Sequence, residues 1–253
     1  MIEVIKIGGN IVDDDQVLDA FLTIFSKEKK PRILVHGGGK IATRISAALN
    51  IETQMVEGRR VTDAETLKVV TMVYAGLINK TIVAKLQAKG INAIGLCGAD
   101  ANIIQSHKRN RGSVDYGFVA DVDVVDGAFL HKLILDGYTP VLSPISHDKQ
   151  GLLLNTNADT IASVTALALS KIKETSLTYC FELPGVLTDI HDKTSVIENI
   201  DKAKYLDLKA QGIIADGMIP KLDNCFDAIH NGVSKVRICH ALQLNEHVGT
   251  TLY

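Results

Sequence analysis

The sequence lacks the cysteine and histidine patterns of disulfide-rich and metal-binding proteins. Its eight histidines are dispersed, and its four cysteines form no Cys-x-x-Cys pair. Three of these cysteines lie in apolar segments, so we expect reduced core thiols in a cytoplasmic protein, with no disulfide framework and no metal site. The cysteines are Cys97, Cys180, Cys225 and Cys239.

Strong charge and targeting signals are also absent. The formal net charge of -2 at pH 7 gives no electrostatic reason to expect a nucleic-acid partner or an anionic membrane. The one dense basic run, Lys108 to Arg111, is interpreted as a solvated loop tip. Lys6 and two glycines interrupt the apolar N-terminus at once, so neither a secretion signal nor a membrane signal is predicted.

The most informative stretch of the chain is Ile33-Leu34-Val35-His36-Gly37-Gly38-Gly39-Lys40. Apolar β-forming residues precede three glycines, and an amphipathic pattern follows, which predicts a buried strand, a tight loop and the start of a helix. Glycines let the backbone approach an oxyanion, and the first N–H groups of a helix are free to bind it. The stretch therefore predicts a cradle for a phosphate-like anion.

Two well-known glycine motifs offer different interpretations of this cradle. A P-loop is excluded, because Leu34 and Ile41 stand where it requires a glycine and a serine or threonine. The dinucleotide pattern Gly-x-Gly-x-x-Ala fits from Gly37 to Ala42, with Glu57 at the distance of a ribose-binding acid. Glycine-rich turns occur throughout α/β folds, so a NAD-dependent oxidoreductase is an alternative from a different class.

Two lysines occupy positions that ordinary structure disfavours. Lys6 lies near the end of the apolar strand Ile2 to Ile7, where the alternative is an edge-strand lysine that reaches water. Lys221 falls in the first turn of a predicted helix, where its charge opposes the helix dipole. Because the first two strands of such a sheet end at one edge, we expect Lys6 to face the same anion as the glycine cradle.

Polar residues also gather at two predicted helix starts. Arg60 precedes a predicted capping box, Thr62 to Glu65, which opens a helix to about Lys89. This arginine is either a carboxylate-binding group or an ordinary surface residue. Asn155 and Asp159 flank the predicted N-cap Asn157, and capping by Asn157 alone does not explain them.

Helix, glycine and strand recur in that order along the chain. Gly90, Gly137 and Gly232 each separate a helical pattern from a strand, which is typical of α/β winding. A hairpin formed by residues 103–106 and 117–122 is predicted to lie over one face as a lid or a pocket wall.

Five motifs in the expected order give the chain a resemblance to the amino acid kinase family over essentially its whole length. They are Lys6-Ile-Gly-Gly9, His36-Gly-Gly-Gly39, Gly58-x-Arg60-Val-Thr62, Asn155-x-Asn157-Ala-Asp159 and Asp216-Gly-Met-x-x-Lys221. The resemblance implies an α/β fold, a three-layer αβα sandwich with a mostly parallel, open central sheet. It also implies an N-terminal lobe, 1–150, for acylglutamate binding and dimerisation, and a C-terminal lobe, 151–253, for ATP.

The resemblance further implies a reaction and its site residues. The γ-phosphoryl group of ATP, with Mg²⁺, would be transferred to the side-chain carboxylate of N-acetyl-L-glutamate, the second step of arginine biosynthesis. The catalytic residues would be Lys6, Lys221 and Asp159, and the substrate-binding residues Gly38, Gly39, Arg60 and Asn155. The nucleotide would contact Gly8, Gly9, Gly185, Ile213, Ile214 and Ala215.

The chemistry of such a transfer agrees with these roles. A glutamate side chain has a reference pKa of about 4.3, so the acceptor is already ionised at pH 7 and needs no general base. The reaction instead requires positive charge that brings two anions together. Asp159 is therefore predicted to hold the two lysines in place and not to accept a proton.

Two positions depart from the family pattern. Glu182 stands where the family commonly has Asp, and Ala120 stands where it usually has Gly in the hairpin over the acyl pocket. Ala120 leaves N-succinyl-L-glutamate open as an alternative substrate. Kinases of the same fold that act on aspartate, glutamate, carbamate or UMP are the nearest rivals, and an inactive regulator is a further alternative.

The resemblance also bears on assembly. Hexameric, arginine-inhibited members of the family carry an extra N-terminal helix, whereas this chain begins at its first strand. We therefore expect an arginine-insensitive homodimer whose other partner is the small-molecule substrate.

Overall fold

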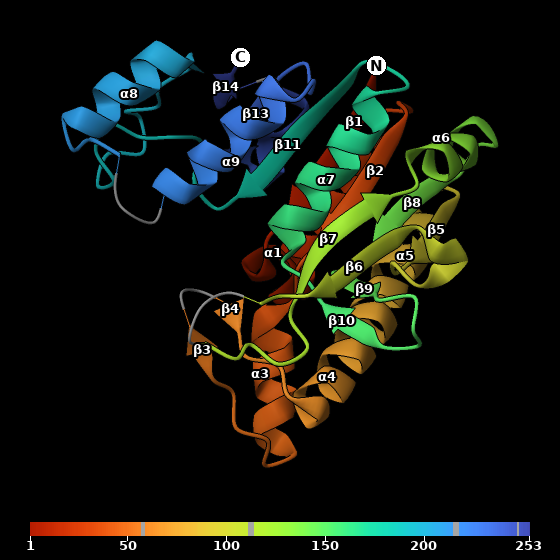
Figure 1. The fold of residues 1–253 in the computed structure, drawn as a ribbon. Helices are drawn as coiled ribbons and strands as arrows, with labels where there is room; N and C mark the ends of the chain where they lie inside the picture. Colours follow the sequence, from red (N-terminus) through yellow and green to blue (C-terminus); the bar gives the residue numbers. More distant parts are fainter. Residues whose placement is uncertain (57–58, 111–113, 215–217, 247) are drawn as a thin grey trace.

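The computed structural model describes residues 1–56, 59–110, 114–214, 218–246 and 248–253 (Figure 1). An eight-stranded sheet forms its centre, and every pairing between its described strands is parallel except that of Val236–His240 with Thr250–Leu252, which is antiparallel. From one edge to the other the strands are β12 (Asn199–Ile200), β14 (Thr250–Leu252), β13 (Val236–His240), β11 (Thr175–Phe181), β1 (Ile2–Ile7), β2 (Arg32–His36), β8 (Thr139–Leu142) and β5 (Ala93–Leu96).

Helices cover both faces of this sheet (Figure 1). One face packs against α6 (Gly127–Leu135), α7 (Ala158–Ser170) and α9 (Ile219–His230), and α8 (Lys202–Ala210) packs beside α9. The other face packs against α2 (Asp15–Ser26), α5 (Asn79–Ala88) and a short 3₁₀ helix, Ala241–Glu246. The predicted three-layer αβα sandwich with a mostly parallel, open sheet is confirmed.

Strand β1 lies in the middle of the sheet, between β2 and β11. Lys6 is the register partner of Val35 on one side and of Tyr179 on the other. Because both sides of β1 are paired, the edge-strand alternative for Lys6 is wrong. Alternate side chains of a strand point to opposite faces, so Lys6 shares the face of Val4, which packs against α7.

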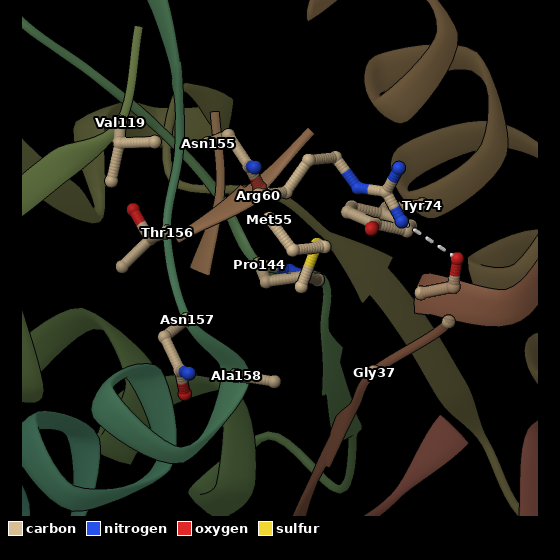
Figure 2. Close-up of a pocket in the computed structure, with 12 residues that line it drawn as sticks. Gly37, Met55, Arg60, Tyr74, Val119, Pro144, Asn155, Thr156, Asn157 and Ala158 are labelled. Carbon is tan, nitrogen blue, oxygen red and sulfur yellow. Dashed lines mark hydrogen bonds between the residues drawn. The ribbon is translucent and has the colours of Figure 1, made fainter. Parts of the chain in front are cut away.

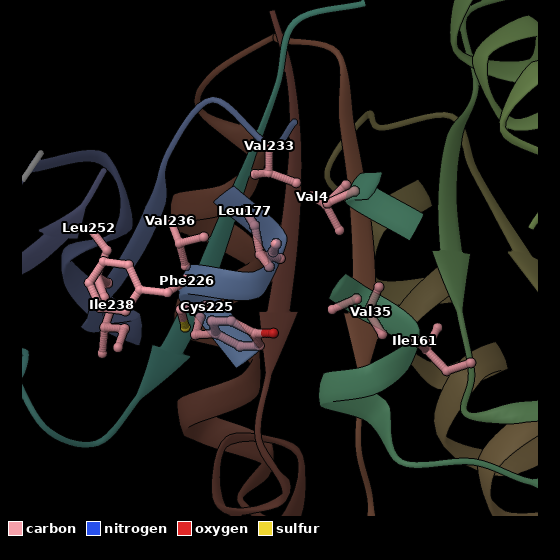
Figure 3. Packing of buried hydrophobic residues seen from close by; sticks show 14 of the residues in the cluster. Val4, Val35, Ile161, Leu177, Cys225, Phe226, Val233, Val236, Ile238 and Leu252 are labelled. Atoms are coloured by element: carbon pink, nitrogen blue, oxygen red, sulfur yellow. The ribbon is translucent and has the colours of Figure 1, made fainter. Parts of the chain in front are cut away.

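The core on the α7 face is continuous across the middle of the sheet. Figure 3 shows Val4, Val35 and Leu177 from three neighbouring strands beside Ile161 of α7 and Phe226 of α9. Burial of each such side chain contributes about 1.5 to 3 kcal/mol. This packing holds the N-terminal end of α7 against the C-terminal end of β1. The residues at these two ends therefore have fixed positions relative to each other.

A single long helix runs from Ala64 to Ala88, through α4 (Ala64–Val70), the π-helical segment Thr71–Ile78, and α5. Asp63 is its N-cap and accepts a hydrogen bond from the Thr66 N–H at 2.7 Å, so the predicted capping box with Thr62 as N-cap is wrong. By length and composition alone this helix is apolar enough to cross a membrane. Its buried residues, however, pack on the central sheet as those of a core helix do.

A second sheet of four strands stands beside the main one. Its order is β10 (Leu153–Asn155), β9 (Ile145–His147), β6 (Ile104–Lys108) and β7 (Ala120–Val125). The antiparallel pairing of β6 with β7 confirms the predicted inserted hairpin. The remaining elements are α1 (Gly9–Asp13), α3 (Gly39–Ala48), the strand pair β3 (Met55–Val56) and β4 (Arg59–Arg60), and a 3₁₀ turn at Asp100–Asn102.

The basic run at the end of β6 is only partly a solvated tip. Arg109 is largely buried and forms an ion pair with Asp121, so the interpretation is wrong for this residue. The Lys108 ammonium lies 4.0 Å from the centre of the Phe118 ring. Arg111 lies outside the described residues.

All four cysteines are free thiols, and three of them are fully buried. Their burial agrees with the expected core positions. The sequence separates Cys180 from Cys239, but β11 and β13 are neighbours and make the two residues register partners.

Candidate active site

Two glycine loops meet at the carboxyl edge of the central sheet. The loop after β1 carries Gly8 and Gly9, and the loop after β2 carries Gly37 to Gly39. The Gly37 N–H donates to the Ile7 carbonyl at 3.1 Å, and a Cβ atom placed on Gly37 would lie 3.6 Å from the Gly9 nitrogen. The two loops are thus adjacent, as the order of the strands predicted.

Gly38 holds the second loop against the long helix. Its φ of 154° lies in a region that L side chains rarely adopt, and an added Cβ atom would stand 2.2 Å from Ile78 Cδ1. Gly38 is also the N-cap of α3 and has no side chain of its own for that role. The first N–H groups of α3 therefore remain available for an anion.

A cavity of about 180 Å³ lies in front of this loop (Figure 2). It brings together the predicted substrate-binding residues Gly38, Gly39, Arg60 and Asn155. The other lining residues are Gly37, Met55, Tyr74, Val119, Pro144, Thr156, Asn157 and Ala158. Ala120 is buried but does not line the cavity, whereas its neighbour Val119 does.

Arg60 is held by acceptors on three sides. Its guanidinium donates to the hydroxyls of Thr53 at 3.0 Å and Thr43 at 2.8 Å. It also donates to the Gly39 carbonyl at 2.9 Å, the contact that Figure 2 marks with a dashed line. Only 8% of the residue is exposed, so the surface-arginine alternative is wrong. A fixed, buried guanidinium that faces a cavity is suited to bind a carboxylate.

Asn155, the last residue of β10, is held in place by Thr62, which was expected to be the N-cap of the long helix. Its side-chain amide donates to the Thr62 hydroxyl at 3.0 Å, and Thr62 donates in turn to the Arg60 carbonyl at 2.9 Å. Thr62 therefore ties the predicted carboxylate ligand Arg60 to the predicted ligand Asn155, and this explains its position in the motif.

The three predicted catalytic residues form one cluster. Lys6 Nζ lies 2.7 Å from Asp159 Oδ1, and Lys221 Nζ lies 3.9 Å from Asp159 Oδ2. The first contact is a short ion pair, in which the opposite charges of the ammonium and the carboxylate attract each other. Asp159 is the second residue of α7, and the Asn157 side chain accepts its N–H at 2.7 Å, which confirms the predicted N-cap.

Burial and charge oppose each other within this cluster. Burial raises the Asp159 pKa, but Lys6 and Lys221 outweigh it and hold that pKa below its usual value. Burial lowers the Lys221 pKa, and the Asp159 carboxylate partly restores it. The Phe181 ring lies under both ammonium groups, with its centre 3.7 Å from Lys221 Nζ and 5.5 Å from Lys6 Nζ.

A larger cavity of about 790 Å³ adjoins the first one and reaches this cluster. The two cavities share Gly39, Met55 and Arg60, and Lys6 and Phe181 line the larger one. The predicted nucleotide residues Gly8 and Gly9 line it too. An anion bound at Arg60 and a second anion bound at the β1 loop would therefore meet beside Lys6.

The other predicted nucleotide residues lie farther along the chain. Gly185 packs tightly, because an added Cβ atom would stand 2.7 Å from the Thr250 hydroxyl. Ile214 is buried in the core, and Ile213 packs partly against it. Ala215 lies outside the described residues. Of the three that the structure describes, Gly185, Ile213 and Ile214, none lines the two cavities described above.

No group of three or more His, Cys, Asp or Glu side chains in the described parts of the chain is arranged to hold a metal ion. Glu57, the acid that the dinucleotide alternative requires, lies outside the described residues.

His36, which ends β2, is a supporting residue for which the sequence motif predicted no separate role. It is fully buried, its Nδ1 lies 2.9 Å from the Gly37 carbonyl, and the Asn79 side-chain amide lies 3.2 Å from its Nε2. Since Asn79 is a donor here, Nε2 accepts and Nδ1 carries the proton to Gly37. Burial lowers the His36 pKa to about 4, against the smaller raising effect of Gly37, so the ring is neutral at pH 7.

This buried ring predicts a pH dependence of stability. A folded pKa of about 4 lies below the unfolded value of 6.5, so the stabilisation is complete above pH 6.5 and is lost as the pH falls toward 4. The loss from this residue amounts to about 3 kcal/mol of unfolding free energy. Urea unfolding between pH 7.5 and 4.5 measures it. A His36→Asn variant should be less stable at pH 7 and show a flatter pH dependence, whereas the exposed control His191→Asn should follow the parent protein; equal slopes in all three would contradict the prediction.

Comparison with known proteins adds to this geometry. Residues 1–240 match the Amino acid kinase family. The chain is 57% identical over 256 residues to the acetylglutamate kinase of Cytophaga hutchinsonii, covering 98% of this chain and 97% of that one. It is 55% identical over 249 residues to the acetylglutamate kinase of Phocaeicola vulgatus, again covering 98% and 97%.

A solved structure has the same architecture. The crystal structure of smu.665 from Streptococcus mutans UA159 superposes with a TM-score of 0.80 at 25% identity, covering 99% of this chain and 98% of that one. The similarity in sequence and in fold therefore extends over nearly the full length of the chain.

Proposed function

Because the chain belongs to the amino acid kinase family, we propose that it transfers the γ-phosphoryl group of ATP to the side-chain carboxylate of N-acetyl-L-glutamate. The products would be ADP and an acyl phosphate, N-acetyl-L-glutamyl 5-phosphate, the second step of arginine biosynthesis, carried out in the cytoplasm. The observation that carries the proposal is the Lys6–Asp159–Lys221 cluster beside a cavity that contains a buried arginine.

The site supports this reaction through its charges. In the transfer, a carboxylate oxygen of the acceptor forms a bond to the γ-phosphorus, and the bond from that phosphorus to the bridging oxygen of ADP breaks. Both reactants are anions, so positive charge at the meeting point lowers the barrier. Lys6 and Lys221 supply it, and the N–H groups of the two glycine loops add further donors.

Arg60 and Asn155 are proposed to bind the N-acetylglutamate, with Gly38 and Gly39. The two side chains enter the same cavity from different elements, and Thr62 links them. Asp159 is proposed to hold the lysines in place, because its pKa lies below its usual value and it remains an anion at pH 7. Gly8, Gly9, Gly185, Ile213, Ile214 and Ala215 are proposed to contact ATP.

Mg²⁺ is proposed to enter with the nucleotide, held by phosphate oxygens, where it neutralises charge on the transferred group. A polyphosphate suits the larger cavity, because two lysines, two arginines and three glycines are among the residues that line it. Two acidic residues also line this cavity: Asp13, the last residue of α1, and Glu182, which follows β11.

The proposal is tested by measuring ADP release with ATP and Mg²⁺. N-Acetyl-L-glutamate, N-succinyl-L-glutamate and L-glutamate are compared at equal concentrations. We expect the acetylated substrate to give the highest kcat/KM. Preference for the succinyl compound would change the acyl group, and absence of ADP release with all three would contradict the proposal. Thermal shifts with ATP-Mg and with NAD separate the kinase from the oxidoreductase alternative.

The order of the strands supports the proposed division into two lobes. In the central sheet, β1, β2, β8 and β5 come from residues 1–150 and occupy one half, whereas β11, β13, β14 and β12 come from residues 151–253. The cavity with Arg60 adjoins the first half, so we propose that 1–150 binds the acylglutamate and that 151–253 binds ATP.

We also propose a homodimer, formed through the long helix Ala64 to Ala88. Met72 and Leu77 of its π-helical segment are 56% and 54% exposed, although the same helix buries Val73 and Ile78 in the core. Large apolar side chains that remain exposed on one helix indicate an interface. A two-fold axis through this surface would bury each side chain against the partner's copy.

A Leu77→Asp substitution is expected to abolish this dimer. The charge would appear twice at a two-fold interface and would lose its hydration there, so the equilibrium should shift to a monomer. Size-exclusion chromatography with light scattering should report 27.3 kDa for the variant and twice that mass for the parent. Leu135→Asp is the matched control, because Leu135 is 72% exposed at the end of α6. A dimeric Leu77→Asp variant would rule out this surface.

A further inference from the structure

Tyr74 lines the same cavity as Arg60 and Asn155, but none of the motifs described above contains it. It lies in the π-helical segment Thr71–Ile78, and only 6% of the residue is exposed. In Figure 2 its ring lies beside the Arg60 side chain, close to the glycine loop. Its small exposed area therefore belongs to the cavity and not to the outer surface.

The π-helical turn explains how the ring reaches this place. Such turns occur mainly as local insertions in helices, frequently at functional sites. Tyr74 and Ile78 both pack on Gly38: a Cβ atom placed there would stand 3.3 Å from Tyr74 Cδ1 and 2.2 Å from Ile78 Cδ1. The ring is thus fixed by the loop whose N–H groups are proposed to bind substrate.

The phenol is in a suitable state to donate a hydrogen bond. Burial raises the Tyr74 pKa, against the opposing effect of the Arg60 guanidinium, so the hydroxyl keeps its proton at pH 7. The Arg60 side chain lies beside the Tyr74 ring (Figure 2), and a guanidinium can only donate hydrogen bonds. In the described part of the chain we find no side chain or carbonyl that accepts the Tyr74 proton in return.

We propose that Tyr74 is a substrate-binding residue, whose hydroxyl donates a hydrogen bond to the N-acetylglutamate carboxylate that Arg60 binds. A carboxylate in front of the guanidinium would offer the acceptor that the phenol lacks, because an ionised carboxylate has about four acceptor positions. Tyr74 and Arg60 would then bind the same carboxylate of the substrate, and the Tyr74 ring would also remain packed on Gly38. The inference rests on the proposed function.

The experiment compares the parent protein with Tyr74→Phe, which removes only the hydroxyl. Loss of a hydrogen bond to a charged group predicts a KM for N-acetyl-L-glutamate that rises by about 10-fold or more. The KM for ATP should change less than twofold and kcat less than threefold. Tyr138→Phe is the matched control, because Tyr138 is 39% exposed and lies outside both cavities.

A second substrate identifies the contacted group. With the α-carboxamide of N-acetylglutamate, whose neutral oxygen is a weaker acceptor, the ratio of KM values between Tyr74→Phe and the parent should be smaller than with the carboxylate. An unchanged KM in Tyr74→Phe would overturn the inference, as would equal rises in both KM values, since a structural defect would produce the latter. Parent protein that releases no ADP with N-acetyl-L-glutamate would instead overturn the proposed function and the inference with it.

Discussion

Replacing Lys6 with methionine is expected to lower kcat by about two to three orders of magnitude, because it removes one preorganised positive group from the meeting point of two anions. The KM for N-acetyl-L-glutamate should change little, since Arg60 and Asn155 bind that substrate in the proposed site. Methionine has a similar length and no charge, so it removes the ammonium group while it keeps the packing of the Lys6 carbon chain, of which little is exposed. Steady-state kinetics of ADP release give both constants.

The matched control is Lys202→Met on α8. The Lys202 ammonium also lies over aromatic rings, 5.2 Å from the centre of Tyr205 and 5.0 Å from that of Phe226, but it lines neither cavity. Its kcat should match that of the parent, and the melting temperature of both variants checks the fold. A Lys6→Met protein that keeps more than a tenth of the parent kcat would show that Lys221 and the backbone suffice.

Replacing Asp159 with asparagine is expected to lower kcat by about a hundredfold, because it releases the ammonium groups of Lys6 and Lys221 from their fixed positions. The acidic side of the pH–rate profile should keep its shape, since the Asp159 pKa is below its usual value and the group stays ionised there. The alkaline side should move to lower pH. Asp159 raises the Lys221 pKa in the parent, so without it Lys221 loses its proton earlier.

The pH–rate profile distinguishes an organising residue from a base. If Asp159 accepted a proton during the reaction, the parent would show an acidic limb that Asp159→Asn abolishes. Asp126→Asn is the matched control, since Asp126 also lies at a helix start and accepts the Phe129 N–H at 2.8 Å, far along the chain from the cluster. An alkaline limb that stays in place in Asp159→Asn would contradict the coupling to Lys221.

The cluster of Lys6, Asp159 and the glycine loops was largely predictable from sequence. Each residue stands where a strand ends or a helix begins, and parallel strands bring their carboxyl ends to one edge. Residue alternation then decides the face, since Lys6 follows Val4 at the spacing of a strand. The positions of such residues can be predicted because they depend only on where strands end, where helices begin and how side chains alternate along a strand.

Other features depend on contacts that no local pattern contains. Thr62 and Asp63 are both good N-caps, and the choice between them follows from the hydrogen bonds of Thr62 to Arg60 and Asn155. The π-helical turn that aims Tyr74 at Gly38 leaves no mark in the apolar pattern of its helix. Cys180 and Cys239 lie opposite each other on β11 and β13, and this neighbourhood depends on the order of the strands in the sheet, which no local pattern predicts.

The central position of β1 in the sheet also has a consequence while the ribosome is synthesising the chain. Its neighbour β2 follows closely, but its other neighbour β11 begins at Thr175, which leaves the ribosome 168 residues after Ile7. During most of translation one edge of the apolar strand Ile2–Ile7 therefore has no partner, and open strand edges recruit other chains. This edge stays open until β11, Thr175–Phe181, has also been made.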